Sequence, residues 1–269
     1  MKKIIFGEDE IKDIVNLTLN GISTKTIKNK YNCSSSTILR LLEKNNITRP
    51  SRTYNVNEKY FDNIDTEDKA YFLGFLYADG NVSKVKNAIS LEIQERDKPI
   101  LELFAKFSEN TKPFYFRKRN NENWSALYTF HISSKYMKNT LFNYGLTPNK
   151  SLVLKFPKYI NDDLIQHFIR GYFDGDGCIS YGNSNKSLRF SVTGTLNFIS
   201  TIQKILMEKC NLNENKIHTQ GTIFTLEYSG NIQVIRIKDY LYKGATIFLE
   251  RKFNKFTKQK PRINPGLKR

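Results

Sequence analysis

The stretch GYFDGDG, residues 171–177, ends an apolar, helix-like segment with three glycines and two aspartates. A second stretch, GFLYADG at residues 74–80, has the same skeleton of Gly, four residues and Asp-Gly. A single Asp-Gly after a helix is usually an ordinary turn. A skeleton that recurs 97 residues later, each time ahead of two strand-like segments, favours a functional explanation instead.

Each copy of the skeleton opens a unit with the same order of expected elements. In the first unit, strands are expected near 81–86 and 88–94, a helix over 98–107, strands near 114–119 and 125–132, and a helix over 134–144. In the second, strands are expected near 178–183 and 187–193, a helix over 195–209, strands near 215–219 and 222–228, and a helix over 231–243. The sequence therefore predicts an α+β fold of two αββαββα halves related by a pseudo-twofold axis.

Small residues are spaced four apart in both skeleton helices, as Gly74 and Ala78 in the first and Gly171 and Gly175 in the second. Residues at this spacing share one helix face, so the two helices can approach more closely than larger side chains allow. We therefore expect the helices to pack on each other.

This packing would bring Asp79 and Asp176 together where the two helices end. Two neighbouring carboxylates are costly unless they are protonated or bridged by cations. We expect Mg²⁺ held by both acids, where it would polarise phosphate groups and lower the pKa of a bound water. The position of Asp174 corresponds to Tyr77 in the first copy, which is not acidic. We therefore interpret Asp174 as a helix-end or packing residue.

The N-terminal part predicts three short helices: Asp9–Asn20, Ser23–Tyr31, and a third that starts in the serine cluster of CSSSTILRLLEKNN. This order is typical of a helix-turn-helix module, whose last helix enters the DNA major groove. The residues nearest the bases would be Ser35, Ser36, Thr37 and Arg40. The alternative is a three-helix bundle that only packs against its neighbour.

The formal charge of +17 and the pI near 9.6 indicate a polyanionic partner, either nucleic acid or an anionic membrane. No apolar run reaches the length of a membrane span and the N-terminus lacks a secretory apolar region, which favours nucleic acid and an intracellular location. A bacterial, phage or organellar origin stays open. The isolated Cys33, Cys178 and Cys210 are expected to be reduced, buried thiols.

FLGFLYADG and IRGYFDGDG resemble the two LAGLIDADG motifs of monomeric LAGLIDADG homing endonucleases, over about Thr66–Phe256. The resemblance implies two halves that form a DNA-binding saddle, and a Mg²⁺-dependent enzyme that cuts both strands to leave short 3′ overhangs. It also implies that Asp79 and Asp176 are the metal-binding catalytic acids. The carbonyl groups of Ala78 and Gly175 would complete the metal shell.

Segments that follow each half, NKSLVLKFP (149–157) and ATIFLERKFNKF (245–256), are also similar to this family. Their Lys150 and Lys252 are candidates for stabilising the transition state, although a lysine beside DNA more often anchors phosphate. The division expected is a helix-turn-helix module at 1–47, a linker at 48–66, halves at 67–157 and 158–256, and a basic tail at 257–269.

Linker and strand positions supply the remaining DNA-binding candidates, because Arg, Lys and Asn are the residue types that contact phosphates and base edges. These candidates are Arg49, Arg52, Lys84, Lys86, Arg117, Lys118, Arg119, Asn121, Tyr181, Asn183, Asn185, Lys186 and Arg189.

The leading hypothesis is thus a monomeric, site-specific double-strand DNA endonuclease. The alternative is a nucleic-acid-binding protein on the same scaffold that does not cut: an intron RNA maturase, with RNA as a partner, or a transcription regulator. Loss of cutting usually accompanies loss of an acid, and both acids are present. A DNA-packaging protein would fit the charge but leaves the repeated skeleton unexplained.

Overall fold

The computed structural model describes residues 6–49, 54–121, 124–181 and 187–257. The chain divides into two compact units, Met1–Tyr54 and Asn55–Arg269. Each unit is described by itself.

The first unit consists of three helices, α1 (Glu8–Leu19), α2 (Thr24–Lys30) and α3 (Ser35–Lys44). The side chains of Ser23 and Ser34 accept hydrogen bonds from backbone N–H groups in the first turns of α2 and α3, which explains where both helices begin. Ile14, Ile27, Ile38 and Leu42 form a small core of their own. The three helices expected from the sequence are confirmed.

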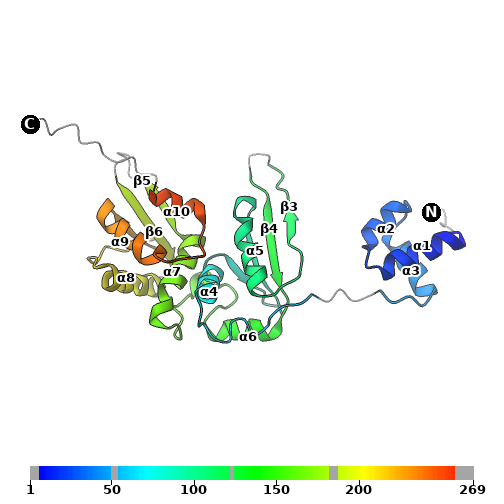
Figure 1. Ribbon diagram of the computed structural model, residues 1–269, viewed down its shortest axis with the longest axis horizontal. Coiled ribbons are helices and arrows are strands. Elements are labelled where there is room, and N and C mark those ends of the chain that lie inside the picture. Colours follow the sequence, from blue (N-terminus) through cyan, green and yellow to red (C-terminus); the bar gives the residue numbers. More distant parts are fainter. Residues whose placement is uncertain (1–5, 50–53, 122–123, 182–186, 258–269) are drawn as a thin grey trace, which may run out of the picture. The chain divides into compact units, whose positions relative to one another are not determined.

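The second unit contains the repeated arrangement. Its first half runs through α4 (Glu67–Asp79), β1 (Gly80–Val82), β2 (Ile89–Gln94), α5 (Lys98–Phe107), β3 (Tyr115–Arg117), β4 (Leu127–Ile132) and α6 (Lys135–Asn143). Its second half runs through α7 (Asp162–Asp176), β5 (Cys178–Tyr181), β6 (Leu188–Gly194), α8 (Leu196–Cys210), β7 (His218–Gln220), β8 (Ile223–Ser229) and α9 (Asn231–Tyr242), and α10 (Glu250–Thr257) follows. In Figure 1 these elements run from cyan, at α4, to red, at α10.

Each half contains one antiparallel four-stranded sheet, with the strand orders β1-β2-β4-β3 and β5-β6-β8-β7. One face of each sheet is covered, by α5 in the first half and by α8 and α9 in the second. The alternation of β2, where Ile89, Leu91 and Ile93 are buried and the residues between them are not, shows that the other face is left open. The identical order confirms an α+β fold of two αββαββα halves.

The first strand of the first half is shorter than expected, because it ends at Val82 rather than near residue 86. Lys138, a buried residue of α6, donates hydrogen bonds from Nζ to the carbonyl oxygens of Ser83 and Lys86, at 2.7 and 3.0 Å. The turn after β1 is thus held by this side chain together with one backbone hydrogen bond, from Ser83 N–H to the Ala88 carbonyl oxygen at 3.0 Å. This tertiary contact leaves no local pattern in the sequence.

Two further expectations need correction. Cys178 is exposed and not buried, because it lies on the open face of its sheet, opposite Ser191. The stretch 48–66 was expected to be a linker, yet Tyr60, Phe61 and Ile64 are buried in the main core. Its residues from Asn55 onward belong to the second compact unit.

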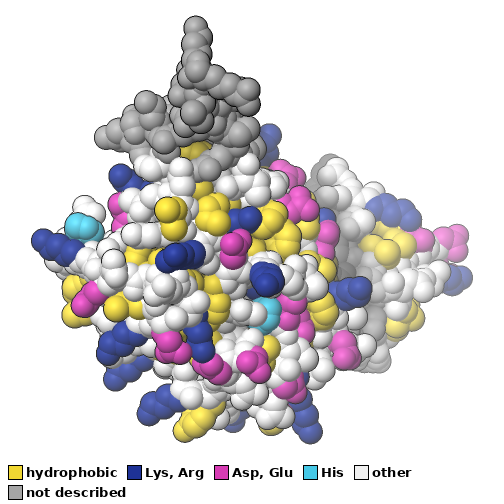
Figure 2. Space-filling model, turned by 60° about the vertical axis from the view of Figure 1, so that its left-hand side comes forward, with side chains coloured by type: hydrophobic (Ala, Val, Ile, Leu, Met, Phe, Trp, Pro, Cys, Tyr) yellow, Lys and Arg dark blue, Asp and Glu magenta, His cyan; other side chains and the backbone are white. Residues whose placement is uncertain are grey.

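Within the described ranges, no helix combines the length and the apolar character that crossing a membrane requires. Basic and acidic side chains are intermingled on the face that Figure 2 shows.

Candidate metal centre and nucleic-acid interface

Helices α4 and α7 lie side by side and meet with backbone against backbone (Figure 1). A Cβ atom added at Gly74 would lie 2.0 Å from the Phe168 carbonyl oxygen, and one at Gly171 would lie 1.9 Å from the Tyr71 carbonyl oxygen. Only glycine permits such an approach. The expected packing of the two skeleton helices is confirmed.

Each of the two helices ends on an aspartate, Asp79 in α4 and Asp176 in α7, and both side chains are exposed. The carboxylate of Asp79 reaches toward the other helix, because a Cβ atom at Gly175 would stand 3.2 Å from Asp79 Oδ2. The structure therefore brings the two predicted acids together at one end of the helix pair.

The surroundings of both carboxylates disfavour their charged form. Surrounding protein atoms displace water, and the negative charge of Asp176 adds to this effect, which raises the pKa of Asp79 to about 6. Loss of solvation also raises the pKa of Asp176, while Lys150 and Lys252 act in the opposite direction. A bound cation would relieve the repulsion between the two acids.

Two lysines lie at the same helix ends. Lys150 Nζ donates to the Ala78 carbonyl oxygen at 2.6 Å. Lys252 is only 4% exposed, and its Nζ donates to the carbonyl oxygens of Phe173 (2.6 Å), Gly175 (3.0 Å) and Gly177 (2.6 Å). Burial lowers the pKa of Lys252 to about 8 and lowers the pKa of Lys150 as well.

The carbonyl groups of Ala78 and Gly175 thus accept hydrogen bonds from these lysines. A carbonyl oxygen has two lone pairs, so each can still accept a second partner. Among the described residues, no group of three or more His, Cys, Asp or Glu side chains could hold a metal ion. Two exposed carboxylates fit Mg²⁺, which keeps several waters and commonly takes its other ligands from substrate phosphates.

Asp174 is fully buried and belongs to the core of the helix pair. Its carboxylate accepts hydrogen bonds from Tyr71 Oη (2.8 Å), Tyr242 Oη (3.0 Å) and the Leu249 backbone N–H (2.7 Å). At the equivalent position of the first half, Tyr77 donates to the Tyr144 carbonyl oxygen. These contacts agree with the interpretation of Asp174 as a packing residue.

A buried ion pair across the two halves was missed at the sequence level. Arg170, 0% exposed, donates from Nη2 to Glu67 Oε1 at 2.6 Å and from Nε to the Ile247 carbonyl oxygen at 2.9 Å. An arginine inside the apolar run LIQHFIRGYF was the available signal, since arginine is rarely fully buried unless it is paired.

Four of the candidate DNA-contacting residues of the first unit lie in α3. Ser35, Ser36 and Arg40 are exposed and Thr37 is half-buried. The hydroxyl groups of Ser36 and Thr37 form hydrogen bonds with Ser34 Oγ, at 2.7 and 2.8 Å. Arg49 is exposed and donates to Thr24 Oγ1 at 3.2 Å.

The arginines on the open faces of the sheets have acidic partners that the sequence did not single out. Arg117 Nη2 donates to both carboxylate oxygens of Glu92, at 2.8 and 3.0 Å. Arg189 Nε lies 3.1 Å from Glu227 Oε1. Each half therefore presents one arginine beside one glutamate.

The other strand and turn candidates are spread around these sheets. Lys84 and Lys86 are exposed in the turn after β1, and Tyr181 donates to the Lys255 carbonyl oxygen at 3.0 Å. Lys118, Arg119 and Asn121 follow β3, and the Arg119 guanidinium lies 5.6 Å from the Trp124 ring centre. Arg52, Asn183, Asn185 and Lys186 lie outside the described residues.

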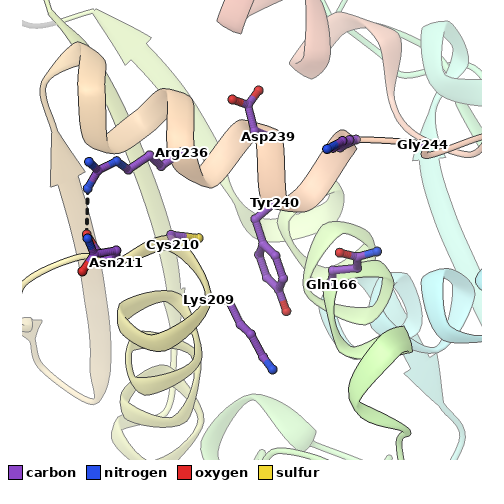
Figure 3. A pocket seen from close by; sticks show the side chains of 9 residues that line it. Gln166, Lys209, Cys210, Asn211, Arg236, Asp239, Tyr240 and Gly244 are labelled. Carbon is purple, nitrogen blue, oxygen red and sulfur yellow. Dashed lines mark hydrogen bonds between the residues drawn. The ribbon is translucent and has the colours of Figure 1, made fainter.

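A surface pocket of the second half lies between α8 and α9 (Figure 3). Arg236 donates to the Asn211 carbonyl oxygen at 2.8 Å at its edge. Lys209, also in its lining, forms an ion pair with Asp162 at 2.5 Å. The pocket contains neither of the two acids at the helix ends.

Several curated proteins and solved structures are similar to this chain. A subunit Rpo1C of DNA-directed RNA polymerase from Methanocaldococcus jannaschii is 30% identical over 113 residues, and a replication factor C small subunit from the same organism is 27% identical over 159 residues. The matches cover 42% and 56% of this chain but only 13% and 8% of those two proteins.

The crystal structure of the I-LtrWI LAGLIDADG homing endonuclease bound to target DNA is 14% identical, with coverage of 75% of this chain and 89% of that chain and a TM-score of 0.47. The homing endonuclease I-WcaI bound to its DNA recognition sequence is 14% identical, with coverage of 74% and 91% and a TM-score of 0.49. Residues 163–241, which run from α7 into α9, match the family model for a LAGLIDADG-like domain.

Proposed function

We propose that this protein is a site-specific, Mg²⁺-dependent endonuclease that hydrolyses one phosphodiester in each strand of double-stranded DNA. The observation that carries the proposal is the pair of exposed acids, Asp79 and Asp176, at the abutting ends of α4 and α7. Each acid comes from one half of a duplicated fold. This arrangement suits a duplex, whose two antiparallel strands are themselves related by a local twofold axis.

The two halves supply matching sets of groups. Asp79 is accompanied by Lys150 and Asp176 by Lys252, and each lysine is bound to the carbonyl oxygen just before its acid. Asp79 and Asp176 would hold the metal ion, with the carbonyl groups of Ala78 and Gly175 within its reach. When bound, Mg²⁺ would polarise the phosphate and lower the pKa of a coordinated water.

The lysines would supply positive charge beside the phosphates that are cut. Charge that develops in a transition state is stabilised by groups fixed before the reaction begins. Both lysines are fixed by hydrogen bonds to the helix ends, Lys252 by three and Lys150 by one. If the two cuts lie on opposite sides of the minor groove, the product would have short 3′ overhangs.

The rest of the chain would provide DNA affinity as a monomer. The surplus of positive charge favours association with a polyanion. The open sheet faces would lie along the DNA grooves, and the three helices of the first unit would act as a helix-turn-helix module on adjacent DNA. In this arrangement α3 would present Ser35, Ser36 and Arg40, which are exposed, toward the bases.

Cleavage of a plasmid library tests the proposal. The full chain is incubated with Mg²⁺ and plasmids that carry randomised inserts, and the ends produced are sequenced. We expect cuts at one recurring sequence with a fixed stagger between the strands, and no cuts when EDTA replaces Mg²⁺. Tight DNA or RNA binding with intact plasmids at every Mg²⁺ concentration would instead favour the binding protein without cutting, such as an RNA maturase.

A further inference from the structure

The segment Thr246–Lys252 leaves α9 and leads into α10, and we refer to it as the clasp segment. Although it belongs to the second half, it is bound to Glu67, the first residue of α4 in the first half. Thr246 N–H donates to Glu67 Oε1 at 2.8 Å, and Thr246 Oγ1 donates to Glu67 Oε2 at 2.9 Å. The Ile247 N–H donates to the same carboxylate at 3.1 Å.

A second tie to the first half lies at the other end of the clasp segment. Arg251 donates from Nε to Asp97 Oδ1 at 2.8 Å and from Nη2 to Asp97 Oδ2 at 2.9 Å. Asp97 immediately precedes α5 and is 7% exposed. A fork of two parallel hydrogen bonds fixes both the distance and the angle between its partners.

Between these two ties, the clasp segment is bound to the second half. The Leu249 N–H donates to buried Asp174, and the Ile247 carbonyl oxygen accepts from Arg170. Lys252 then places its Nζ against three carbonyl oxygens at the end of α7. The lysine that accompanies Asp176 is therefore the next residue after an arginine that is anchored in the opposite half.

Lys150, the corresponding lysine of the first half, is held in a different way. It lies in a single turn of 3₁₀ helix, Lys150–Leu152, and the side-chain contact found for it is one hydrogen bond to Ala78. Among the described residues, its neighbours Asn149 and Ser151 show no side-chain hydrogen bond or ion pair to the second half, although the Leu154 carbonyl oxygen, four residues on, accepts a hydrogen bond from Thr195 Oγ1. The two lysines thus occupy equivalent places at the helix ends, but Lys252 follows a side chain that is anchored in the opposite half and Lys150 does not.

We propose that Asp97 and Arg251 form a positioning pair for Lys252, so that the first half fixes the lysine of the second half. This inference rests on the proposed cleavage of both strands. Loss of the pair would let α10 shift, and a displacement of a reacting group by about 1 Å can cost on the order of a hundredfold in rate. Only the strand whose cleavage depends on Lys252 would be slowed.

Strand-resolved cleavage by the full-length chain tests the pair. A duplex that contains the target is labelled differently on each strand, and the rates of cutting of both strands are measured for Arg251→Met and Asp97→Asn. We expect both variants to slow one and the same strand by at least about tenfold relative to the other, so that nicked duplex accumulates. Lys150→Met should slow the opposite strand.

A matched control separates positioning from general stability. Lys209→Met removes the ion pair with Asp162, which joins two helices within the second half, and should leave the strand ratio unchanged. Arg251→Lys keeps the charge but not the fork, so its strand ratio should lie between those of the wild type and Arg251→Met. If Arg251→Met fails to fold, Asp97→Asn still tests the pair, because asparagine has the same shape as aspartate but lacks its charge.

Equal slowing of both strands in folded Arg251→Met and Asp97→Asn, or slowing of the strand that Lys150→Met affects, overturns the positioning role. A wild-type chain that binds the target but cuts neither strand would remove the proposed function and the positioning role with it. A cutting wild type with an unchanged strand ratio in both variants overturns the positioning role alone.

Discussion

The backbone of Gly171 lies so close to Tyr71 that a Cβ atom at position 171 would stand 1.9 Å from the Tyr71 carbonyl oxygen. The reciprocal contact joins Gly74 and Phe168, where the corresponding distance is 2.0 Å. Since α4 and α7 end on Asp79 and Asp176, these two backbone contacts set the separation of the acids.

Leucine in place of Gly74 or Gly171, the two glycines at which α4 and α7 touch, should therefore reduce activity more than stability. In Gly74→Leu or Gly171→Leu the helices must move apart, and overpacking of this kind typically costs about 1–3 kcal/mol or more. The acids would separate as well. Thermal melts and cleavage rates of both variants check this, with Gly7→Ala as control because its nearest neighbour would be 3.8 Å away. Unchanged melting temperatures and cleavage rates in the leucine variants would show that α4 and α7 do not touch at these two glycines.

Neutral amides at the helix ends should separate binding from cutting. Asp79→Asn and Asp176→Asn each remove half of the charge that would hold Mg²⁺, so cleavage should be lost in both. DNA binding should be retained or slightly improved, because one repulsion with phosphate is removed. Filter binding and plasmid cleavage on the same preparations measure the two properties. Full cutting by either variant in Mg²⁺ would refute the assignment of the metal centre.

The raised pKa of Asp79 predicts how metal-free protein responds to pH. The folded chain holds the Asp79 proton up to pH about 6, whereas the unfolded chain releases it near pH 3.8. The folded state therefore binds more protons between these values, and stability falls as pH rises through this window. The melting temperature of the wild type minus that of Asp79→Asn, measured in EDTA, should therefore decrease from pH 4 to pH 7.

Added Mg²⁺ should reverse this loss at pH 7, because a cation favours the ionised carboxylates. Asp65 serves as the control, since its hydrogen bond with Lys69 lowers its pKa. The difference between wild type and Asp65→Asn should not fall over this range, because a lowered pKa makes stability rise with pH until about pH 5 and leaves it level above. A wild-type curve that stays parallel to that of Asp79→Asn throughout would contradict the raised pKa.

The duplicated fold could be predicted because its signals are local and occur twice. Two Gly-x4-Asp-Gly skeletons located α4 and α7, and strand-like alternation located the sheets. The bounds of the short strands were less accurate: β7, expected near 215–219, is His218–Gln220, and β1 ends at Val82. Lys138, for instance, binds two carbonyl groups of the turn after β1, and nothing in residues 81–86 indicates a partner 55 residues away. The aromatic pair Tyr60 and Phe61 could have indicated a packed segment within the supposed linker.

The sequence indicated the two acids of the candidate site and named Lys150 and Lys252 as candidates, but it did not indicate the residues that hold Lys252 in place. Spacing in two helices sufficed to place Asp79 beside Asp176. Glu67, Asp97 and Arg251 are ordinary charged residues in sequence, and their importance comes from partners more than a hundred residues away. Such long-range pairs leave no periodicity that a single sequence could reveal.

Equivalent positions in the two halves should differ in their tolerance of substitution. Asp174→Asn places an amide N–H₂ among three hydrogen-bond donors in the core, and an unsatisfied buried group costs about 1–3 kcal/mol. Tyr77→Phe removes one hydrogen bond to the Tyr144 carbonyl oxygen without burying a new polar atom, so it should cost less. Urea unfolding of both variants compares them. Equal losses would mean that Asp174 is held more loosely than its contacts indicate.

The first unit should lengthen the DNA contact at one end of the target. Residues 1–54 form a separate compact unit with ten Lys and Arg against five Asp and Glu, and it occurs once, whereas the αββαββα unit occurs twice. A chain that starts at Asn55 keeps Asp79, Asp176, Lys150 and Lys252, so it should still cut at high protein concentration.

Deletion of residues 1–54 should weaken binding, and the slope of log affinity against log salt should fall by about 0.9 for every phosphate that the shortened chain no longer neutralises. The protected stretch should shorten at one end of the target only, because a single recognition helix reaches a single adjacent major groove. Footprints of the full-length and shortened chains on one target decide the matter, with Arg40→Ala in the full chain as a milder test of α3. Identical protection at both ends would show that the three helices do not bind the target, and the DNA-reading role of Ser35, Ser36, Thr37 and Arg40 would then have to be given up.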